Sequence, residues 1–506
     1  MLEKIPNWIK KSPVFFLLLY FGIGCATIKQ YGLPLDDFTQ YVIGKVNYEY
    51  LNGQRSIEEI EVDMRYYGPV FETICYAIDC EFDIEPQPTQ KWGMRHAFLF
   101  LLFTLALASL FQISKKLFQS NSTAWILMLM LAFYPRVFAD AHYNSKDTLF
   151  LSLLLIGLYP FSLAMLSLKK RHFIISAFVF GIATTIRLSG FFIMPIAAFV
   201  IVLFVILNKS KLKEWVIPFL LFVVVWLAAY YAVFPALWLH PISEFMTLVH
   251  RMQAFPWPNE TLVAGEFVGP NHRVWWYLPV WFGITMPVAY IFAFLVSVIA
   301  IFMSLKKKIT SFTLRDVLTF FFLIWFVVNM GVVMMTKPVL YDSWRQFQFV
   351  IIPFIIVCGV AISKMNEFGI FQKIIKLVVF YQLLVLIYLN PAQYVYFNEY
   401  YWLFGSRNSY DQDYWSVSTE HCVDWLDRQK FQKPIYIYTA GSNTGWLNLF
   451  FYQNNKSRQF FIADSIEQAD YEIETIRNRK PYNGQRKVVY SLVPLKDTIA
   501  RIIQVK

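Results

Sequence analysis

Apolar runs of membrane-crossing length alternate with short polar segments along most of the chain. A helix needs about 20 mostly apolar residues to cross the hydrocarbon core of a bilayer, and about 11 runs approach that length. The predicted spans are 13–29, 96–114, 123–141, 148–168, 173–186, 190–207, 215–236, 277–304, 317–335, 347–363 and 376–390. The fifth and sixth are short and separated only by "TIRLSG", so one long kinked helix is the alternative there. The pattern predicts a mainly α, polytopic transmembrane helical bundle.

The basic residues indicate how these spans are directed. They gather at every second connection, as Lys4, Lys10 and Lys11; Lys115 and Lys116; Lys169, Lys170 and Arg171; Lys209, Lys211 and Lys213; Lys306, Lys307 and Lys308; and Lys373 and Lys376. If the spans alternate in direction, all these clusters fall on one side, as the positive-inside rule requires. We therefore expect a cytoplasmic N-terminus and an external C-terminus. No small-residue cleavage site follows the first run, which predicts a retained helix and not a removed signal peptide.

Three long segments then fall on the outer side. The first, 30–95, is acidic, and its stretch "MRYYGPVFETICYAI" predicts a helix along the membrane interface with tyrosines at headgroup depth. The second, 237–276, is aromatic. The tail alternates β-prone runs ("PIYIYTA", "RQFFIA", "KVVYSLV") with the helical stretch "STEHCVDWLDRQK". We expect a transmembrane domain over 1–400 and a small extracytoplasmic α/β domain over 401–506.

The composition supports a membrane protein. Hydrophobic residues make up 57% of the chain and charged residues 16%, where a soluble protein carries about a quarter. The net charge of +11 is explained by the basic clusters, so we expect no nucleic-acid partner. Of five cysteines, only Cys75 and Cys80 are close in sequence. They could form a disulfide in an oxidising compartment, or Cys75 could face the membrane on an amphipathic segment.

Several catalytic motifs are missing, which narrows the chemistry. The chain has no P-loop, no HExxH, no GxSxG and no paired CxxC, so nucleotide hydrolysis, zincin chemistry and a serine-hydrolase elbow lack support. Polar groups remain at the outer ends of spans. They are Asp36 and Asp37 after the first span, "HYNSKD" (His142 to Asp147), Arg187, and "KPVLYDSWRQF" (Lys337 to Phe347). Each alone could be a solvated loop group or a snorkelling arginine. Together, at one membrane face, they suit a substrate with a phosphate and a hydroxyl to deprotonate.

A metal site has weaker support. The histidines on the outer side, His142, His240, His250 and His272, could join carboxylates around zinc or manganese, yet no pair has ligand spacing. We therefore expect no obligatory metal, with a divalent ion as the alternative. The tryptophans of segment 237–276 could stack on sugar rings, and an aromatic belt explains them equally well.

At these motifs the sequence resembles a known family. "GLPLDDFTQYVIGK" is similar to the acidic first-loop motif of the GT-C membrane glycosyltransferases, in the branch of the protein O-mannosyltransferases and aminoarabinose transferases. "PRVFADAHYNSKDTLF" resembles the second outer loop of bacterial members. "GIATTIRLSG", "LYDSWRQFQFVIIP", "NPAQYVYFNEY" and "DYWSVS" resemble further blocks of the same proteins, so the resemblance covers roughly residues 10–425. One departure is Asp37, where many members carry Glu.

The resemblance implies transfer of a mannose-like hexose or a pentose from a polyprenyl-phosphate donor to an acceptor hydroxyl, with inversion. A carboxylate would accept the hydroxyl proton, and cationic donors or a metal would stabilise the leaving phosphate. Asp36 aligns with the family's first acidic position, and Asp36 or Asp37 is the implied base. The implied substrate-binding residues are Asn144, Lys146, Asp147, Arg187, Tyr341, Asp342 and Arg345.

Two other readings stay open. A transporter or lipid flippase would need charges near the bilayer midplane. A non-catalytic relative would need only residues 405–506, as a partner-binding domain. The resemblance to bacterial members implies a bacterial inner membrane with a periplasmic active face, and an endoplasmic reticulum membrane is the alternative. The acceptor (protein, lipid or glycan) is not indicated by the sequence.

Overall fold

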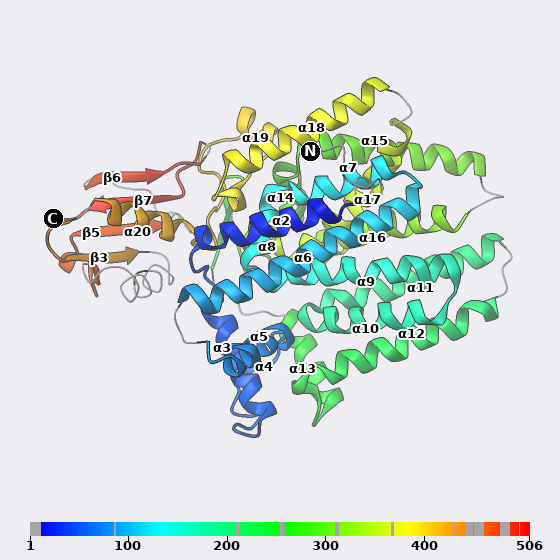
Figure 1. Ribbon diagram of the computed structural model, residues 1–506, viewed down its shortest axis with the longest axis horizontal. Coiled ribbons are helices and arrows are strands. Elements are labelled where there is room, and N and C mark those ends of the chain that lie inside the picture. Colours follow the sequence, from blue (N-terminus) through cyan, green and yellow to red (C-terminus); the bar gives the residue numbers. More distant parts are fainter. Residues whose placement is uncertain are drawn as a thin grey trace.

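The molecule is a long helical bundle with a small β-sheet at one end (Figure 1). The computed structural model describes residues 12–84, 88–208, 212–253, 257, 259–308, 313–365, 369–429, 431–440, 449, 460–475, 486–494 and 496–506. The helices of the bundle run side by side along the long axis of the molecule, and the C-terminus lies in the sheet, at the far end. The predicted mainly α fold with a small sheet part is confirmed.

Each predicted span coincides with helical structure. The bundle helices are α2 (Val14–Thr27), α6 (Pro88–Phe118), α7 (Asn121–Ala132), α8 (Pro135–Tyr143), α9 (Asp147–Ser167), α10 (Lys170–Ile186), α11 (Ile193–Asn208), α12 (Leu212–Ala232), α14 (Tyr277–Thr285), α15 (Val288–Lys308), α16 (Leu314–Thr336), α17 (Ile351–Met365) and α18 (Gly369–Tyr388). In the described part of the chain, 6 helices are long and apolar enough to cross a membrane, or up to 8 if each bent pair is one span. The chain is an integral membrane protein; the number of eleven spans and their direction stay predictions.

Two predicted spans, 123–141 and 277–304, are wrong as continuous helices. The first is divided between α7 and α8, which meet at 64°, and the second between α14 and α15, which meet at 114°. Pro135 begins α8, and Pro287 lies between α14 and α15. A proline lacks the backbone N–H that would continue the helix, and its ring clashes with the preceding turn. The first bend places α8, which is buried along its whole length, beside the loop of the candidate site.

Close helix packing depends on small residues at contact points. A Cβ added at Gly181 of α10 would lie 2.7 Å from the carbonyl oxygen of Trp226 on α12. At Gly157 of α9 it would lie 2.6 Å from the ring of Phe180. Glycine therefore allows α10 to contact both neighbours closely. Large aromatic side chains fill the space between the helices, as with the fully buried Trp325 of α16.

The acidic first segment folds into helices at the end of the bundle near the sheet. These are the 3₁₀ helix η2 (Ile28–Tyr31) and the α-helices α3 (Asp37–Leu51), α4 (Val62–Arg65) and α5 (Val70–Glu81). The predicted single helix over "MRYYGPVFETICYAI" is wrong, because the chain turns between α4 and α5 at Gly68, whose φ is +54°. Cys75 is buried and Cys80 is exposed, and the two form no disulfide. The predicted disulfide and the alternative of a membrane-facing Cys75 are therefore both wrong.

The aromatic segment contributes a short 3₁₀ helix, a helix and a hairpin. They are η4 (Pro235–Leu237), α13 (Pro241–Gln253), β1 (Thr261–Val263) and β2 (Glu266–Val268). Arg251 of α13 pairs with Asp63 of α4 at 2.7 Å, which links this segment to the acidic one.

The C-terminal part forms a five-stranded sheet in the order β4-β3-β5-β7-β6. The strands are β3 (Ile435–Ala440), β4 (Phe460–Ile462), β5 (Tyr471–Thr475), β6 (Lys487–Leu492) and β7 (Ala500–Gln504). Strand β3 pairs in parallel with β4 and β5, and β7 pairs antiparallel with β5 and β6. Helix α20 (Ser418–Arg428) packs on this sheet. The predicted helix and three of these strands are confirmed. Strands β5 and β7 were not predicted.

The connection between the last bundle helix and the sheet packs against the bundle. It holds the short helices η6 (Gln393–Val395) and α19 (Glu399–Phe404). Trp415 lies in one buried cluster with Tyr31 of η2 and Tyr143 of α8. The domain boundary at 400/401 stays a prediction.

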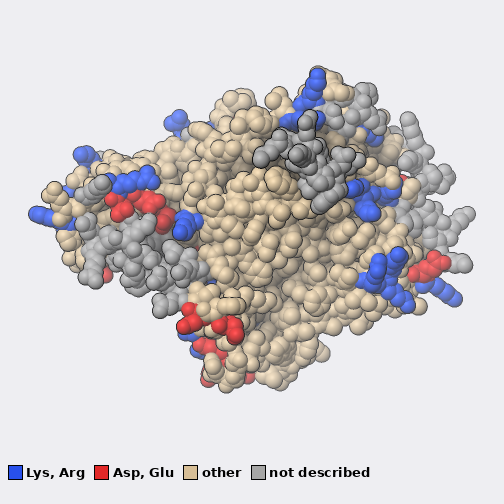
Figure 2. Space-filling view, in the orientation of Figure 1, with Lys and Arg blue, Asp and Glu red and all other residues tan. Residues whose placement is uncertain are grey.

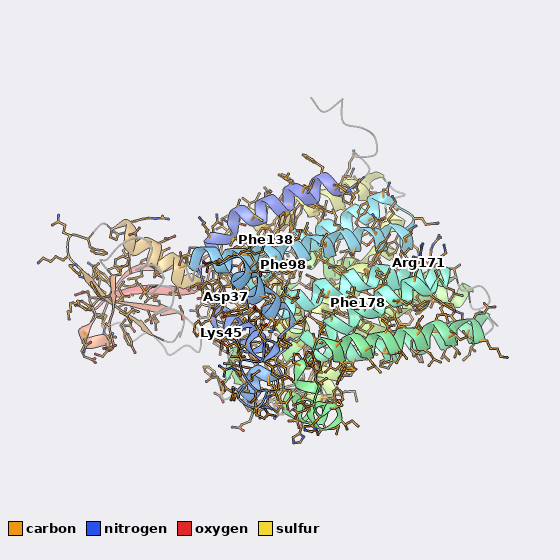
Figure 3. The ribbon with its side chains drawn as sticks, turned by 60° about the horizontal axis from the view of Figure 1, so that its bottom comes forward. Asp37, Lys45, Phe98, Phe138, Arg171 and Phe178 are labelled. Carbon is orange, nitrogen blue, oxygen red and sulfur yellow. The ribbon has the colours of Figure 1, made fainter. Side chains whose placement is uncertain are left out.

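Charged side chains gather toward the two ends of the molecule. Figure 2 shows a middle with few charged side chains, mostly Lys and Arg with an acidic group at the end far from the sheet, and side chains of both signs near the sheet end. Arg171 and Asp37 lie at these opposite ends (Figure 3). A middle with few charges between two charged ends is the surface expected of a membrane-spanning bundle.

Candidate active site

The two adjacent carboxylates of the first segment have different surroundings. Asp36 precedes the first residue of α3, and its side chain is 32% exposed and lines a cavity. Asp37 points the other way, is buried, and lies 3.0 Å from Nε2 of His96 on α6. Burial raises the pKa of Asp37, and the neighbouring His96 opposes that rise. The geometry separates the pair: Asp36 faces the cavity and Asp37 holds α3 against α6.

The loop between α8 and α9 brings three candidate residues to the same place. The side-chain oxygen of Asn144 accepts the backbone N–H of Asp147 at 2.8 Å, and its amide donates to the Asp147 carboxylate at 3.2 Å. This closes the first turn of α9 and places the carboxylate at the helix N-terminus, where negative charge is favourable. Lys146 turns away and donates to the carbonyl oxygens of Tyr67 and Gly68, at 2.8 and 2.9 Å. Burial lowers the pKa of Lys146 to about 8.

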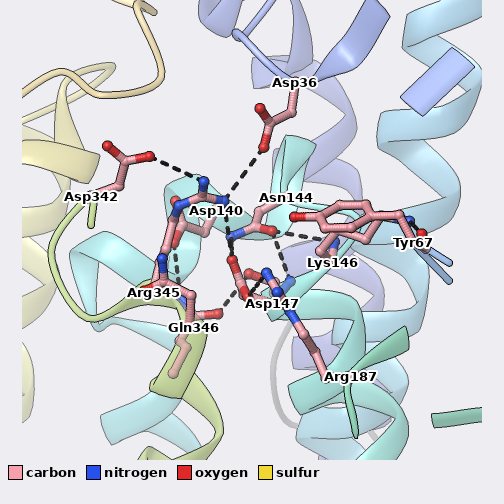
Figure 4. Close-up of polar contacts among 12 residues, drawn as sticks. Asp36, Tyr67, Asp140, Asn144, Lys146, Asp147, Arg187, Asp342, Arg345 and Gln346 are labelled. Carbon is pink, nitrogen blue, oxygen red and sulfur yellow. Dashed lines mark hydrogen bonds and ion pairs between the residues drawn. The ribbon is translucent and has the colours of Figure 1, made fainter. Parts of the chain in front are cut away.

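Two arginines converge on Asp147 from separate helix ends (Figure 4). Arg187, where α10 ends, donates to one carboxylate oxygen at 2.6 Å. Arg345, which begins the 3₁₀ helix η5 (Arg345–Val350), lies 3.4 Å from the other oxygen and 3.4 Å from Asp36. It also pairs with Asp342 at 3.1 Å. The buried Nε of each arginine has no hydrogen-bond partner in the described part of the chain, so each keeps a donor for an anionic oxygen.

The segment before Arg345 has an uncommon backbone. Asp342 and Ser343 have φ values of +55° and +66°, in the left-handed region that costs energy for residues other than glycine. This turn places Tyr341 in a stack on Trp257, with ring centroids 3.9 Å apart and planes at 9°. The two rings form one wall of the cavity beside Arg345.

The cavity has a volume of about 270 Å³ and collects groups from four segments of the chain. Its lining carries the carboxylates of Asp36, Glu61, Asp63 and Asp342 together with the guanidinium of Arg345. Tyr67 closes it from the side of Lys146, whose Nζ lies 5.1 Å from the Tyr67 ring centroid. The arrangement combines a partly exposed carboxylate, two arginines and flat aromatic faces, which suits a ligand with both hydroxyl and anionic groups.

Several residues of the site did not stand out in the sequence. Trp415 lies beneath Arg345, with the guanidinium 4.6 Å from a ring centroid, and donates to Asp140 at 3.1 Å. Glu72 of α5 pairs with Arg95 at 3.2 Å and contacts Ser145 beside Lys146. The "DYWSVS" block contains Trp415, but nothing in its pattern indicates a partner more than 60 residues away. Glu72 is one of many acids in the first segment, and nothing in the sequence marks it as buried and paired with Arg95.

The four histidines do not meet. His142 is buried and contacts Thr27 at 3.0 Å, and its ring lies tilted against that of Tyr31, with centroids 4.5 Å apart. His272 lies 3.9 Å from Glu266 on the exposed hairpin. Within the described residues, no group of three or more His, Cys, Asp or Glu side chains is arranged to hold a metal ion. The described residues therefore offer no candidate ligand set for a divalent metal ion.

Residues 89–238 match the family model described as dolichyl-phosphate-mannose-protein mannosyltransferase. This stretch includes the loop from Asn144 to Asp147 and Arg187, and it excludes Asp36 and Arg345. This match covers 150 of the 506 residues, and over that stretch it supports the resemblance to the GT-C membrane glycosyltransferases. The resemblance predicted from the sequence is thereby confirmed. No curated protein matches the sequence.

Two solved structures resemble the chain only loosely. ArnT from Cupriavidus metallidurans, bound to undecaprenyl phosphate, has 12% identity and a TM-score of 0.49, with 99% of this chain and 98% of that one covered. Arabinofuranosyltransferase AftD from mycobacteria has 11% identity and a TM-score of 0.44, and the chain spans 40% of its length, with 97% of this chain covered. Likenesses of this size decide nothing about the candidate site of this chain.

Proposed function

We propose that this chain transfers a sugar from a polyprenyl-phosphate donor to an acceptor hydroxyl at the outer face of the membrane. The observation that carries the proposal is the convergence of Arg187 and Arg345 on Asp147 beside a cavity that Asp36 lines. A lipid-phosphate leaving group needs cationic donors for its growing charge, and a hydroxyl nucleophile needs a base. Both are present within one network at the end of a membrane bundle.

In this proposal Asp36 is the general base, and the reaction inverts the anomeric carbon. Asp36 lines the cavity, is partly exposed, and is held 3.4 Å from Arg345, so it can meet an incoming hydroxyl near the phosphate-binding group. As the hydroxyl oxygen bonds to the anomeric carbon, the proton passes to Asp36 and the phosphate leaves with the bonding electrons. Asp37 is engaged with His96 and supports the position of α3.

The remaining predicted residues take binding roles. Arg345 lines the cavity and would meet the phosphate directly, while Arg187 and Lys146 lie behind it and would add positive charge. Asp147 and Asn144 hold the arginines in place. Tyr341, stacked on Trp257, offers an aromatic face for a sugar ring, and Asp342 orients Arg345. The family named for dolichyl-phosphate-mannose supports a mannose-like hexose as the first donor to test, and a pentose is the second.

We place the enzyme in a bacterial inner membrane with the site facing the periplasm, and an endoplasmic reticulum membrane is the alternative. Protein, lipid and glycan acceptors all supply the required hydroxyl. Arg171, which belongs to the basic cluster after α9, lies at the end opposite Asp37 (Figure 3), and this supports the external placement of the site.

The deciding experiment measures transfer of labelled sugar by the full chain in proteoliposomes. A panel of polyprenyl-phosphate hexoses and pentoses is supplied with protein, lipid and polysaccharide acceptors. We expect transfer by the wild type, a loss of about 10²- to 10⁴-fold in Asp36→Asn, and a loss below about tenfold in Asp37→Asn. Equal activity of Asp36→Asn and wild type would remove Asp36 as the base. Lipid translocation without transfer from any donor would support the flippase alternative instead.

A further inference from the structure

A second cavity lies where the last bundle helix meets the C-terminal domain. It has a volume of about 210 Å³ and is bounded by the end of α18 and residues 389–392 on one side, and by α20 and strand β6 on the other. It shares no lining residue with the candidate active site. Organic ligands usually occupy pockets of about 300–1,000 Å³, so this cavity suits a compact group and not a whole lipid or oligosaccharide.

Helix α20 points three polar side chains into this cavity. His421, Asp424 and Arg428 line it at helical spacing, while Cys422, Val423 and Leu426 on the other face pack into the core of the sheet domain. In the described part of the chain, neither Asp424 nor Arg428 forms an ion pair, and the buried Nε2 of His421 has no hydrogen-bond partner. Burial lowers the pKa of His421, which disfavours its charged form. The cavity therefore offers one negative and one positive group, neither of which is in an ion pair with another described residue.

The cavity continues a lipid-facing surface. Along α18 the exposed apolar side chains recur every three or four residues and end at the cavity; they are Leu377, Phe380, Leu384, Ile387 and Tyr388. Tyr388 itself lines the cavity and is 71% exposed. Figure 1 shows α18 along the upper edge of the bundle, running toward the sheet domain. Such a stripe on a peripheral membrane helix lies against acyl chains.

We propose that this cavity binds the head group of a membrane phospholipid that carries both an ammonium and a phosphate, as phosphatidylethanolamine does. Arg428 takes the phosphate, Asp424 takes the ammonium, and the acyl chains lie along the apolar stripe of α18. The side chains of Trp425 and Tyr490, stacked with centroids 5.1 Å apart, close the cavity on the side of the sheet. An anionic lipid without an amine leaves Asp424 facing a second negative charge, which is unfavourable.

The bound lipid would join two parts of the molecule. One wall of the cavity belongs to the bundle and the other to the sheet domain, so a head group between them holds the domain against the membrane end of α18. The site does not depend on sugar transfer, and it would stand if the proposed function failed.

The test is lipid binding to the purified full chain, followed by native mass spectrometry. Detergent-solubilised protein is titrated with phosphatidylethanolamine and, separately, with phosphatidylglycerol. We expect the wild type to bind phosphatidylethanolamine about tenfold more tightly, Arg428→Gln to weaken binding of both lipids about fivefold, and Asp424→Asn to remove the preference. Asp427→Asn and Lys433→Gln change exposed charges outside the cavity and should bind like the wild type.

Three results would overturn the proposal. They are equal affinity for the two lipids in the wild type, variants at 424 and 428 that bind like the controls, and displacement of the lipid by a soluble oligosaccharide. The melting temperature of each variant in the same detergent shows that the fold is intact. A further variant, Tyr388→Ser, removes an exposed apolar side chain from the stripe and should weaken both lipids without changing the preference between them.

Discussion

Asp36 and Asp37 show how neighbouring side chains of one type receive different tasks. The direction of each side chain is set by the start of α3, which sends Asp36 to the cavity and Asp37 to His96. The buried Asp37 carboxylate needs its histidine, because an unpartnered charge in such a place costs several kcal/mol. A base must instead be reachable by the substrate, and of the two only Asp36 lines the cavity.

Lys146 predicts a pH dependence of the transfer reaction. Its pKa of about 8 means that the ammonium is present at pH 7 and is lost as the pH rises through 8. If it stabilises the phosphate, the rate of sugar transfer should fall about tenfold between pH 7 and pH 9. The measurement is a pH profile of transfer, in which Lys146→Arg should keep its charge and shift the alkaline limb upward by more than one pH unit.

The same shift has the opposite effect on stability. The pKa of Lys146 in the folded protein lies below the ordinary lysine value near 10.4. Between pH 8 and about 10 the unfolded state therefore binds more protons than the folded state. As the pH rises through this range, the contribution of Lys146 increases the free energy of unfolding. If activity is lost above pH 8, deprotonation of Lys146 has therefore not caused it by unfolding the protein. An unchanged limb in Lys146→Arg would assign the titration to another group.

At the scale of elements, the turn between α4 and α5 connects the acidic segment to the cationic groups. Gly68 has a φ of +54°, its carbonyl oxygen accepts from Lys146, and an added Cβ would lie 2.6 Å from the carbonyl oxygen of Thr185. Arg187 follows two residues later. The turn can therefore approach the end of α10 only without a side chain.

Gly68→Ala should therefore damage both the fold and the site. The left-handed backbone alone costs roughly 1 kcal/mol for alanine, and the contact with α10 adds to this. We expect a lower melting temperature and a loss of transfer of at least tenfold. Gly53→Ala is the matched control, since Gly53 has a φ of +69° and nothing lies within 4 Å of its added Cβ. Equal effects of the two substitutions would mean that backbone strain, and not the contact, is responsible.

The connection before α20 contributes to the site through Trp415. Its ring lies against Arg345, and its indole N–H donates to Asp140, which also accepts from Gln348 at 2.8 Å. Trp415 is a positioning residue for the arginine. A cation over an aromatic face gains about 0.5–2 kcal/mol, more when water is excluded.

We expect Trp415→Leu to raise the KM for the donor about tenfold with a smaller change in kcat, because the arginine stays but is less well held. Trp415→Phe keeps an aromatic face and loses the N–H donor, so it should recover most of the donor affinity. The check is steady-state kinetics with varied donor concentration. If Trp415→Phe behaved like Trp415→Leu, the hydrogen bond to Asp140 and not the stacking would hold Arg345.

At the scale of the whole molecule, the basic clusters between the spans predict its orientation in the membrane. The sheet and Asp37 lie toward the end opposite Arg171 (Figure 3), and Arg171 directly follows the exposed Lys169 and Lys170 in the chain. In a chain without Cys25 and Cys80, we expect Ser491→Cys of β6 to react with a membrane-impermeant maleimide in intact cells. Lys169→Cys should react only after lysis. The reverse labelling pattern would place the site in the cytoplasm.

The sequence by itself determined the membrane bundle, the helical spans and most of the small sheet. The length of an apolar run and the alternation of apolar and polar residues are local properties, because each segment must satisfy its own backbone hydrogen bonds and suit the solvent around it. Pro135 and Pro287, however, divide two spans that length alone made continuous. Strands β5 and β7 became recognisable only through their pairing with β3 and β6.

The candidate site was only partly accessible from the sequence. The sequence indicated four of its residues, because each lies at the outer end of a predicted span and within a motif of the resemblance: Asp36, Asp147, Arg187 and Arg345. Only the tertiary structure decided that Asp36 and not Asp37 faces the cavity, that Glu72 belongs to a buried pair with Arg95, and that Trp415 lies beneath Arg345. These contacts join residues far apart in the chain, and their partners are chosen by packing, which no local pattern records.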